Sequence, residues 1–155
     1  MNSLHKTSSA TSANRAHPHQ GYDKARRETA FSHPRLAGSR VLVVEDDFII
    51  ALDVQSSLEE AGAVVIGPAF TLARALELAT QEKVSAATLD LRLGHDSAAS
   101  VATVLEERHI PFIFYTGQPV GDPVRRAWPH TKVLSKPASG HDIVDAIAEI
   151  IRTTH

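Results

Sequence analysis

The chain has 155 residues, of which 43% are hydrophobic and 22% charged, and it contains no cysteine. This length and composition predict one globular domain with its own core, and the lack of cysteine excludes disulfides, thiolate metal sites and cysteine nucleophiles. No apolar run approaches the roughly 20 residues that span a bilayer, and the N-terminus lacks the apolar core of a secretory signal, so we expect a cytoplasmic protein without a membrane segment.

Charge is distributed unevenly along the chain. Residues 1–39 hold six Lys and Arg against two acidic residues, which leaves 10 of the 16 basic and 16 of the 18 acidic residues for the rest. The excess of acidic residues after residue 39 argues against nucleic acid as the principal partner, and we expect no DNA-binding domain.

Residues 1–38 are rich in Ser, Thr, Ala, His and Arg and show no apolar periodicity. They are predicted to form a disordered N-terminal tail, followed by one domain over residues 39–155. A weakly basic arm that touches a membrane or nucleic acid is the alternative interpretation of this tail.

Strand-like and helix-like segments alternate along the rest of the chain. The predicted strands are short apolar or β-branched runs at residues 41–44, 64–67, 86–91, 111–116 and 133–135. Apolar residues at helical spacing predict helices over about 47–61, after Thr71, after an Asp96-Ser97 start and after Ser139. Prolines and Gly121 between residues 118 and 130 predict a short or irregular fourth helix. Five strand–helix units predict an α/β fold with helices on both faces of a parallel sheet.

Two helix starts carry specific capping signals. Asp47 opens the first helix, and we interpret it as the N-cap of that helix rather than as a further metal ligand. Ser139 is followed three residues later by Asp142, a spacing that resembles a capping box. These signals predict where the first and last helices begin.

Polar side chains lie at or just beyond the carboxyl ends of four predicted strands. They are Glu45, Asp46, Asp90, Thr116 and Lys136. Because the carboxyl ends of parallel strands meet at one edge of a sheet, we expect these side chains to converge there. Three carboxylates so placed would raise one another's pKa unless a cation neutralised them, and oxygen ligands without His or Cys suit Mg²⁺.

A carboxylate beside Mg²⁺, with a lysine and a hydroxyl opposite, suits the acceptance of a phosphoryl group. Asp90 is the predicted nucleophile. Charge that spreads over the phosphoryl oxygens would be stabilised by the metal, by the Lys136 ammonium and by the Thr116 hydroxyl. Gly117 would leave space for the incoming group.

Over residues 40–152 the pattern closely resembles the receiver domain of bacterial response regulators. Four motifs carry the resemblance by their order and spacing: Val-Val-Glu-Asp-Asp at 43–47, Leu-Asp-Leu at 89–91, Phe-Tyr-Thr-Gly at 114–117 and Ser-Lys-Pro at 135–137. The resemblance implies a flavodoxin-like (βα)5 fold with strand order 2-1-3-4-5. It also implies phosphorylation of Asp90 by a sensor histidine kinase or a histidine phosphotransfer protein.

The same resemblance implies a ligand set and a backbone feature. Mg²⁺ would be held by Glu45, Asp46, Asp90 and the backbone carbonyl of Arg92. The peptide bond between Lys136 and Pro137 would be cis, which would aim the lysine at the site.

The sequence departs from the usual receiver pattern at several positions. Val133 stands where many receivers have a switch Tyr or Phe, and Tyr115 is expected to point to the opposite face of its strand from Thr116. The Phe-Tyr-Thr-Gly ending is similar to that of stand-alone receivers with Phe-Ala-Thr-Gly. Arg92 and Gln118 flank the place where water would attack an acyl phosphate, so we expect them to set its lifetime. An unchanged hydrolysis rate after replacement of both would refute this.

The leading hypothesis is a phosphorylatable receiver that signals through protein contacts, without an output domain of its own and without enzyme activity beyond self-phosphotransfer and autodephosphorylation. Phosphorylation would alter contacts of the segment 117–151, which is also the face considered for a homodimer. A phosphoryl sink or relay intermediate and a pseudo-receiver that is never phosphorylated are alternatives. A metal-dependent phosphohydrolase or a topoisomerase–primase type nucleotidyl transferase would need a second acid where Arg92 stands.

Overall fold

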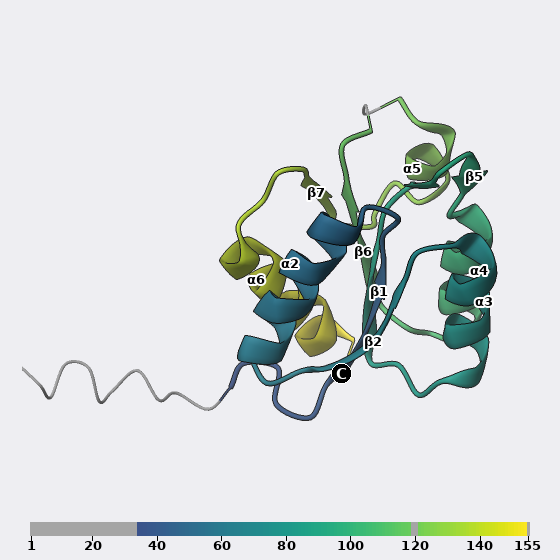
Figure 1. Cartoon of the computed structure of the whole chain (residues 1–155). Helices are drawn as coiled ribbons and strands as arrows, with labels where there is room; N and C mark the ends of the chain where they lie inside the picture. The colour runs from purple at the N-terminus through teal and green to yellow at the C-terminus, as the bar shows by residue number, and fades with distance from the viewer. Residues whose placement is uncertain (1–33, 119–120, 155) are drawn as a thin grey trace, which may run out of the picture. The chain divides into compact units, whose positions relative to one another are not determined.

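A five-stranded parallel sheet forms the centre of the computed structural model, which describes residues 34–118 and 121–154 (Figure 1). The strands in spatial order are β2 (Val64–Ala69), β1 (Arg40–Val44), β3 (Ala86–Leu89), β6 (Phe112–Thr116) and β7 (Val133–Ser135). Counted along the chain, this is the order 2-1-3-4-5. The α/β receiver-like topology predicted from the sequence is therefore confirmed.

Helices cover both faces of this sheet (Figure 1). On one face α2 (Phe48–Glu60) packs beside α6 (Gly140–Thr153), and on the other α3 (Leu72–Gln81) packs beside α4 (Ala99–Glu107). The short α5 (Pro123–Ala127) has five residues, which confirms the prediction of a short fourth helix in the Pro-rich segment. None of the helices formed by the described residues combines the length and apolarity that a membrane crossing requires.

The central strands are apolar on both sides because each side faces a separate core. Val41 and Val43 of β1 belong to the cluster beneath α2 and α6, whereas Leu42 and Val44 belong to the cluster beneath α3 and α4. Such strands lack the alternation of polar and apolar residues seen in half-exposed sheets. The strands therefore have the continuous apolar character on which their prediction rested.

Strand register places the ends of β1 and β3 at the same level. Val44 pairs with Leu89, and the amide of Asp90 donates a hydrogen bond to the carbonyl of Val44 at 3.0 Å. On the other side of β1, the amide of Glu45 donates to the carbonyl of Ala69 at 3.0 Å. The residues that follow each strand therefore emerge side by side at one edge of the sheet.

The predicted helix caps at both ends of the domain are confirmed. The Asp47 carboxylate accepts hydrogen bonds from the amides of Ile49 and Ile50 at 2.9 and 3.1 Å, so it caps α2. Ser139 and Asp142 form a complete capping box at the start of α6. Both caps satisfy amides that have no partner within the helix.

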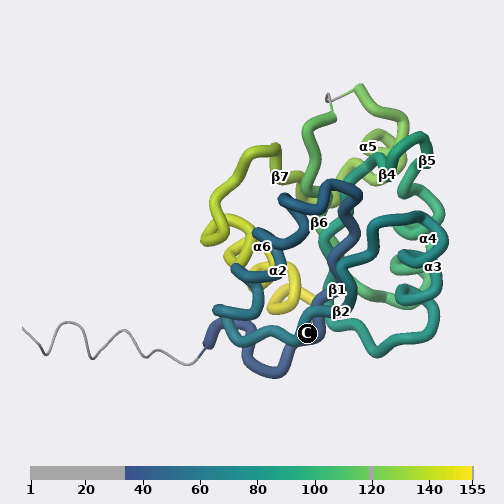
Figure 2. The backbone as a smooth tube through the Cα atoms, in the orientation of Figure 1, coloured from purple at the N-terminus to yellow at the C-terminus, as the bar shows by residue number. Residues whose placement is uncertain are grey.

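The segment after β3 differs from its prediction. The strand expected over residues 86–91 ends at Leu89, and Asp96 and Ser97 form β5 (Asp96–Ser97) opposite β4 (Arg92–Leu93). The Ser97 hydroxyl accepts a hydrogen bond at 3.2 Å from the amide of Ala99, the first residue of α4. Figure 2 shows this small antiparallel hairpin beside the main sheet. Gly94, at φ 63°, permits its tight turn, and the buried Leu93 anchors it to the α3/α4 core. The N-cap of α4 is Ala98.

Some described residues on the N-terminal side of the domain boundary predicted at residue 39 pack on the domain. Residues 34–38, which the sequence assigned to the tail, form a turn, and residues 1–33 of that tail lie outside the described residues. The Leu36 side chain is fully buried against the α2/α6 core, and its amide donates to the carbonyl of Ala61 at 2.9 Å. A single leucine without periodic neighbours gives no sequence signal, so this contact could not be predicted.

We expect Leu36→Ala to lower the free energy of unfolding by about 3 kcal/mol, because it would leave a cavity in a packed core. Urea denaturation measures this change. Leu52→Ala, which removes the same atoms from an exposed position on α2, is the matched control and should cost less than about 1 kcal/mol. Equal losses in the two variants would show that residues 34–38 are not part of the folded domain.

Candidate functional site

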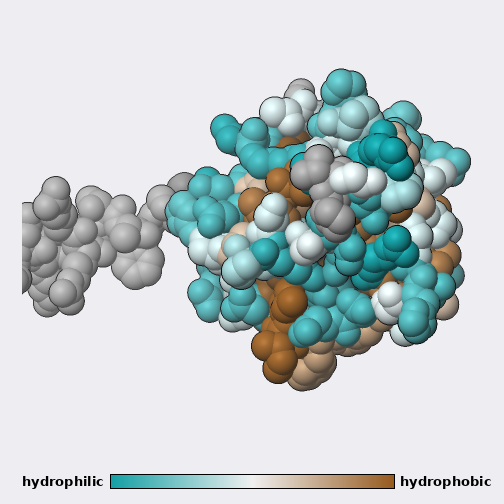
Figure 3. All heavy atoms as spheres, turned by 90° about the horizontal axis from the view of Figure 1, so that it is seen from above, coloured by the Kyte–Doolittle hydropathy of each residue, from teal (hydrophilic) through white to brown (hydrophobic). Residues whose placement is uncertain are grey.

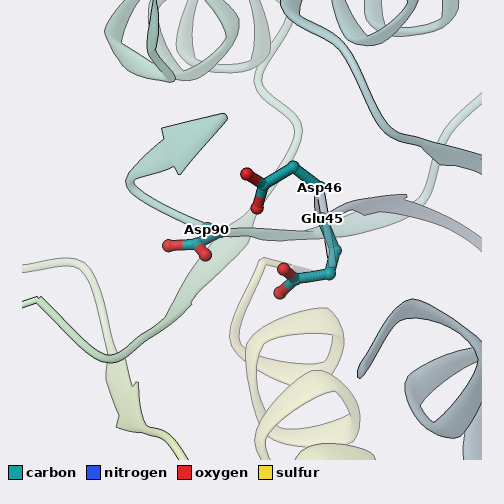
Figure 4. A group of neighbouring side chains, drawn as sticks. All are labelled: Glu45, Asp46 and Asp90. Atoms are coloured by element: carbon teal, nitrogen blue, oxygen red, sulfur yellow. The ribbon is translucent and has the colours of Figure 1, made fainter. Parts of the chain in front are cut away.

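All five polar side chains predicted to converge lie together at the carboxyl edge of the sheet. Figure 4 shows three of them, Glu45, Asp46 and Asp90, at the ends of neighbouring strands. One oxygen from each of these carboxylates lies within 4.8 Å of the others. Thr116, at the end of β6, and Lys136, after β7, complete the cluster through hydrogen bonds to Asp90.

Each carboxylate oxygen of Asp90 has its own side-chain partner. The Thr116 hydroxyl donates to Oδ1 at 2.8 Å, and the Lys136 ammonium donates to Oδ2 at 2.7 Å. The backbone amide of Arg92 also approaches Oδ1, at 3.4 Å. Asp90 itself is only 8% exposed, so its carboxylate is oriented by fixed donors rather than by water. A carboxylate held this way can act as a nucleophile with a hydroxyl and a cation beside the reacting group.

Lys136 also pairs with a second buried carboxylate, that of Glu45, at 2.6 Å. Burial raises the pKa of Glu45, and the repulsion of Asp90 adds to the rise, while hydrogen bonds from Lys136 and from the amide of Asp47 oppose it. For Lys136, burial opposes the charged form, but the hydrogen bonds to Asp90 and Glu45 outweigh it and raise the pKa. The lysine is therefore held as a cation between two strand ends.

Asp46 is the exposed member of the three carboxylates. Its Oδ2 accepts a hydrogen bond from the amide of Gly94 at 2.7 Å, so this carboxylate also ties the β4–β5 hairpin to the end of β1. Three carboxylates face one ammonium here, and their excess negative charge and oxygen donors fit a hard divalent cation such as Mg²⁺. Glu45, Asp46 and Asp90 would hold it, and the Arg92 carbonyl as a further ligand stays a prediction.

Of the residues at which this chain departs from the usual receiver pattern, Arg92, Gln118 and Tyr115 lie beside this cluster. The Arg92 guanidinium lies 3.6 Å from the carboxylate of Asp122, and the Gln118 side chain is exposed while its amide donates to the Thr116 hydroxyl at 3.2 Å. Tyr115 packs in the α2/α6 core, whereas Phe114, two residues before Thr116 on β6, packs in the α3/α4 core. Tyr115 therefore lies on the opposite face of the strand from Thr116, as the alternation of side chains predicted. Val133 is half-buried against the α3/α4 core.

The expected backbone geometry after β7 is also present. The peptide bond between Lys136 and Pro137 is cis. The amide of Lys136 donates to the carbonyl of Thr116 at 3.0 Å, which holds the ends of β7 and β6 side by side. The two side chains that contact Asp90 are therefore fixed to each other through the backbone.

Sequence reasoning missed two residues that support the site. Gly94 binds Asp46 through its amide, which no side-chain pattern could reveal. Asp122 is buried, caps α5 by accepting from the amide of Val124 at 2.9 Å, and pairs with Arg92. Asp122 immediately precedes Pro123, and an Asp-Pro pair is typical of an N-cap followed by the first helical residue, so this signal was available.

Comparison of sequences gives one curated relative. No family model matches the chain. The chain is 31% identical over 100 residues to the phyllosphere-induced regulator PhyR of Methylorubrum extorquens, a match that covers 63% of this chain and 36% of PhyR. The chain thus spans about a third of the length of that relative.

Comparison of structures covers more of the chain. A response regulator receiver protein from Sinorhizobium medicae has a TM-score of 0.66 at 22% identity, over 76% of this chain and 97% of that one. The chain has the fold of a response-regulator receiver domain. PhyR from Brucella abortus matches at 25% identity and a TM-score of 0.65, over 83% of this chain and 55% of its own.

A third receiver-fold relative bears on the site. A response regulator from Burkholderia pseudomallei matches at 28% identity with a TM-score of 0.62, over 74% of this chain and 71% of its own. Its structure is described as containing a phosphorylated aspartic acid, a calcium ion and citrate. That protein therefore combines a phosphorylated carboxyl group with a divalent cation.

We expect Mg²⁺ to bind at this edge and to shift the backbone amide signals of Asp90 and Gly94 in ¹H–¹⁵N spectra. Asp46→Asn should weaken the binding at least about tenfold, because it removes one ligand charge from a hard-cation site. Asp53→Asn, on the exposed face of α2, is the control and should bind Mg²⁺ as wild type does. Equal affinity in the Asp46 and Asp53 variants would contradict the assignment of Asp46 as a ligand.

Proposed function

We propose that this chain is a phosphorylatable receiver in a two-component or phosphorelay system. Asp90 accepts a phosphoryl group from a phosphohistidine of a sensor histidine kinase or a histidine phosphotransfer protein, with Mg²⁺ as cofactor. The observation that carries the proposal is the buried Asp90 carboxylate with Thr116 on one oxygen and Lys136 on the other. The protein acts in the cytoplasm and transmits its state through contacts with other proteins.

The geometry suggests a role for each side chain in the transfer. An Asp90 oxygen forms a bond to phosphorus as the bond from phosphorus to the donor imidazole breaks, and the imidazole leaves with its electron pair. Lys136 and Thr116 then stabilise the negative charge on the phosphoryl oxygens. A bound Mg²⁺ supplies further positive charge to the same oxygens.

One feature of the site and one structural relative favour acceptance of a phosphoryl group over a hydrolase or nucleotidyl transferase. A cation, Arg92, occupies the position where those enzymes need a second acid, and it pairs with Asp122. The Burkholderia relative combines a phosphorylated aspartic acid with a divalent ion. Arg92 and Gln118 remain our proposed determinants of the acyl phosphate lifetime, and membership of the Phe-Ala-Thr-Gly subgroup stays a prediction.

Exposed apolar side chains beside the acidic edge support a protein as the phosphoryl donor. Phe48 is 59% and Ile49 73% exposed at the start of α2, and Leu52 and Phe70 extend this apolar surface. The rings of Phe48 and Phe70 lie 5.8 Å apart. Figure 3 shows apolar surface (brown) interrupting the hydrophilic surface of the molecule seen from above. A contiguous apolar surface next to a reactive carboxylate suits docking of a donor domain.

Incubation with acetyl phosphate and Mg²⁺ should add about 80 Da, one phosphoryl group, to the wild-type protein as measured by intact-protein mass spectrometry. The adduct should be labile to base, because an acyl phosphate hydrolyses readily. Asp90→Asn should abolish the adduct, whereas Asp53→Asn should retain it. An adduct that survives in Asp90→Asn, or none in the wild type under any donor, would contradict the proposed function.

Ile49→Asp should slow phosphotransfer from the cognate phosphohistidine protein by about tenfold or more, because it places a charge in the apolar docking surface. Phosphorylation by acetyl phosphate, which needs no docking, should be unchanged in the same variant. Val64→Asp, on β2, is a matched control for the change of an exposed apolar side chain to a charge. Equal rates for Ile49→Asp and the wild type with the protein donor would remove α2 from the docking surface.

A further inference from the structure

A buried carboxylate outside the Asp90 cluster has no role in the proposed phosphotransfer. The side chain of Asp122 is only 4% exposed, and it lies at the start of the short helix α5. One of its oxygens accepts from the amide of Val124 at 2.9 Å, and the other lies 3.6 Å from the Arg92 guanidinium. Among the ion pairs formed by the described residues, Asp122 is paired with Arg92.

Arg92 is much less constrained than its partner. Its side chain is 46% exposed and makes one ion pair, at a distance longer than an optimal charged hydrogen bond. Its backbone amide, however, lies 3.4 Å from Oδ1 of Asp90, so the residue starts beside the proposed phosphoacceptor. Because the side chain is long and half exposed, rotation of its bonds would turn the guanidinium from Asp122 toward a group attached to Asp90.

A phosphoryl group on Asp90 would change the balance between these two positions. It brings close to two negative charges and planar oxygen pairs that match a guanidinium. Asp122 offers one charge and already uses one oxygen to cap α5. The stronger anion would attract Arg92, and a buried Asp122 left without its counter-charge would destabilise the start of α5.

Resting on the proposed function, we propose that Asp122 is a positioning residue that competes with the Asp90 phosphoryl group for Arg92. In the unphosphorylated protein Asp122 holds the guanidinium and α5 together. Phosphorylation draws Arg92 to Asp90 and releases the N-terminus of α5. The Arg92–Asp122 pair thereby links phosphorylation of Asp90 to the position of α5. Val133 stands where many receivers have an aromatic switch residue, so the ion pair takes the place of that switch here.

The single tryptophan of the chain reports on this release. Trp128 is the C-cap residue of α5; its indole Nε1 donates to Glu106 at 3.2 Å and its ring packs on Phe114 with centroids 6.4 Å apart. A movement of α5 must therefore change the environment of this indole. The amide of Val124, bonded to Asp122, reports on the same event at the other end of the helix.

The test is a titration of the full chain with the phosphoryl mimic beryllofluoride in excess Mg²⁺, followed in ¹H–¹⁵N spectra. The amides of Asp90 and Gly94 report occupancy of the site, and the Val124 amide and the Trp128 indole report release of α5. Asp122→Asn keeps a carbonyl oxygen that can cap α5 but removes the competing charge. Asp96→Asn removes an exposed carboxylate from the β4–β5 hairpin that contains Arg92, and it controls for a general loss of negative charge.

In the wild type we expect both sets of signals to shift. In Asp122→Asn the signals of Asp90 and Gly94 should reach half-saturation at a beryllofluoride concentration about fivefold lower than in the wild type, because no carboxylate competes for Arg92. The shifts at Val124 and Trp128 should be lost in this variant. Arg92→Gln should still bind the mimic without those two shifts. Asp96→Asn should behave as the wild type does.

Two results would overturn the inference while leaving the proposed function intact. One is a beryllofluoride concentration at half-saturation that is the same in Asp122→Asn as in the wild type, or that Asp96→Asn lowers by the same factor. The other is a full response of Val124 and Trp128 in Arg92→Gln. If the wild type shows no shift at Asp90 and Gly94, the mimic does not bind, and the proposed function fails together with the inference.

Discussion

The structure depends above all on the ammonium of Lys136, which lies between two buried carboxylates. Glu45 follows β1 and Asp90 follows β3, and each accepts a hydrogen bond from Lys136 at 2.6 or 2.7 Å. Without this cation, two negative charges would be buried at adjacent strand ends, a state that costs several kcal/mol. The sheet brings the carboxylates of Glu45 and Asp90 together, and the positive charge of Lys136 offsets the cost of burying them. The same arrangement leaves excess negative charge that a divalent cation can neutralise.

Most of the fold could be predicted because the signals were local. Continuous apolar runs marked the five strands, and capping residues such as Asp47 and Ser139 marked helix starts within a residue. The convergence of Asp90, Thr116 and Lys136 could be predicted as well, since parallel strands share one edge. Motif order then supplied the resemblance that the structural comparisons support.

The features that could not be predicted arise from contacts between distant segments. Leu36 lies in a stretch without periodicity, and only its packing against α2 and α6 shows that it belongs to the core. The β4–β5 hairpin depends on a turn at Gly94 and on an amide bonded to Asp46, so the Asp96-Ser97 pair that looked like a helix cap became a strand. Asp122 differs from these, because its Asp-Pro signal was present but its pairing with Arg92 was not visible.

Asp90 is the proposed phosphoryl acceptor, because among the carboxylates of the described residues it alone has a hydroxyl and an ammonium on its two oxygens. Reduction of the phosphorylated protein with borohydride tests this directly, since an acyl phosphate of aspartate is converted to homoserine, which peptide mass spectrometry locates. We expect homoserine at position 90 and unmodified side chains at Glu45 and Asp46. Reduction at either of those carboxylates, or an unmodified residue 90 in protein that carries the phosphoryl adduct, would contradict it.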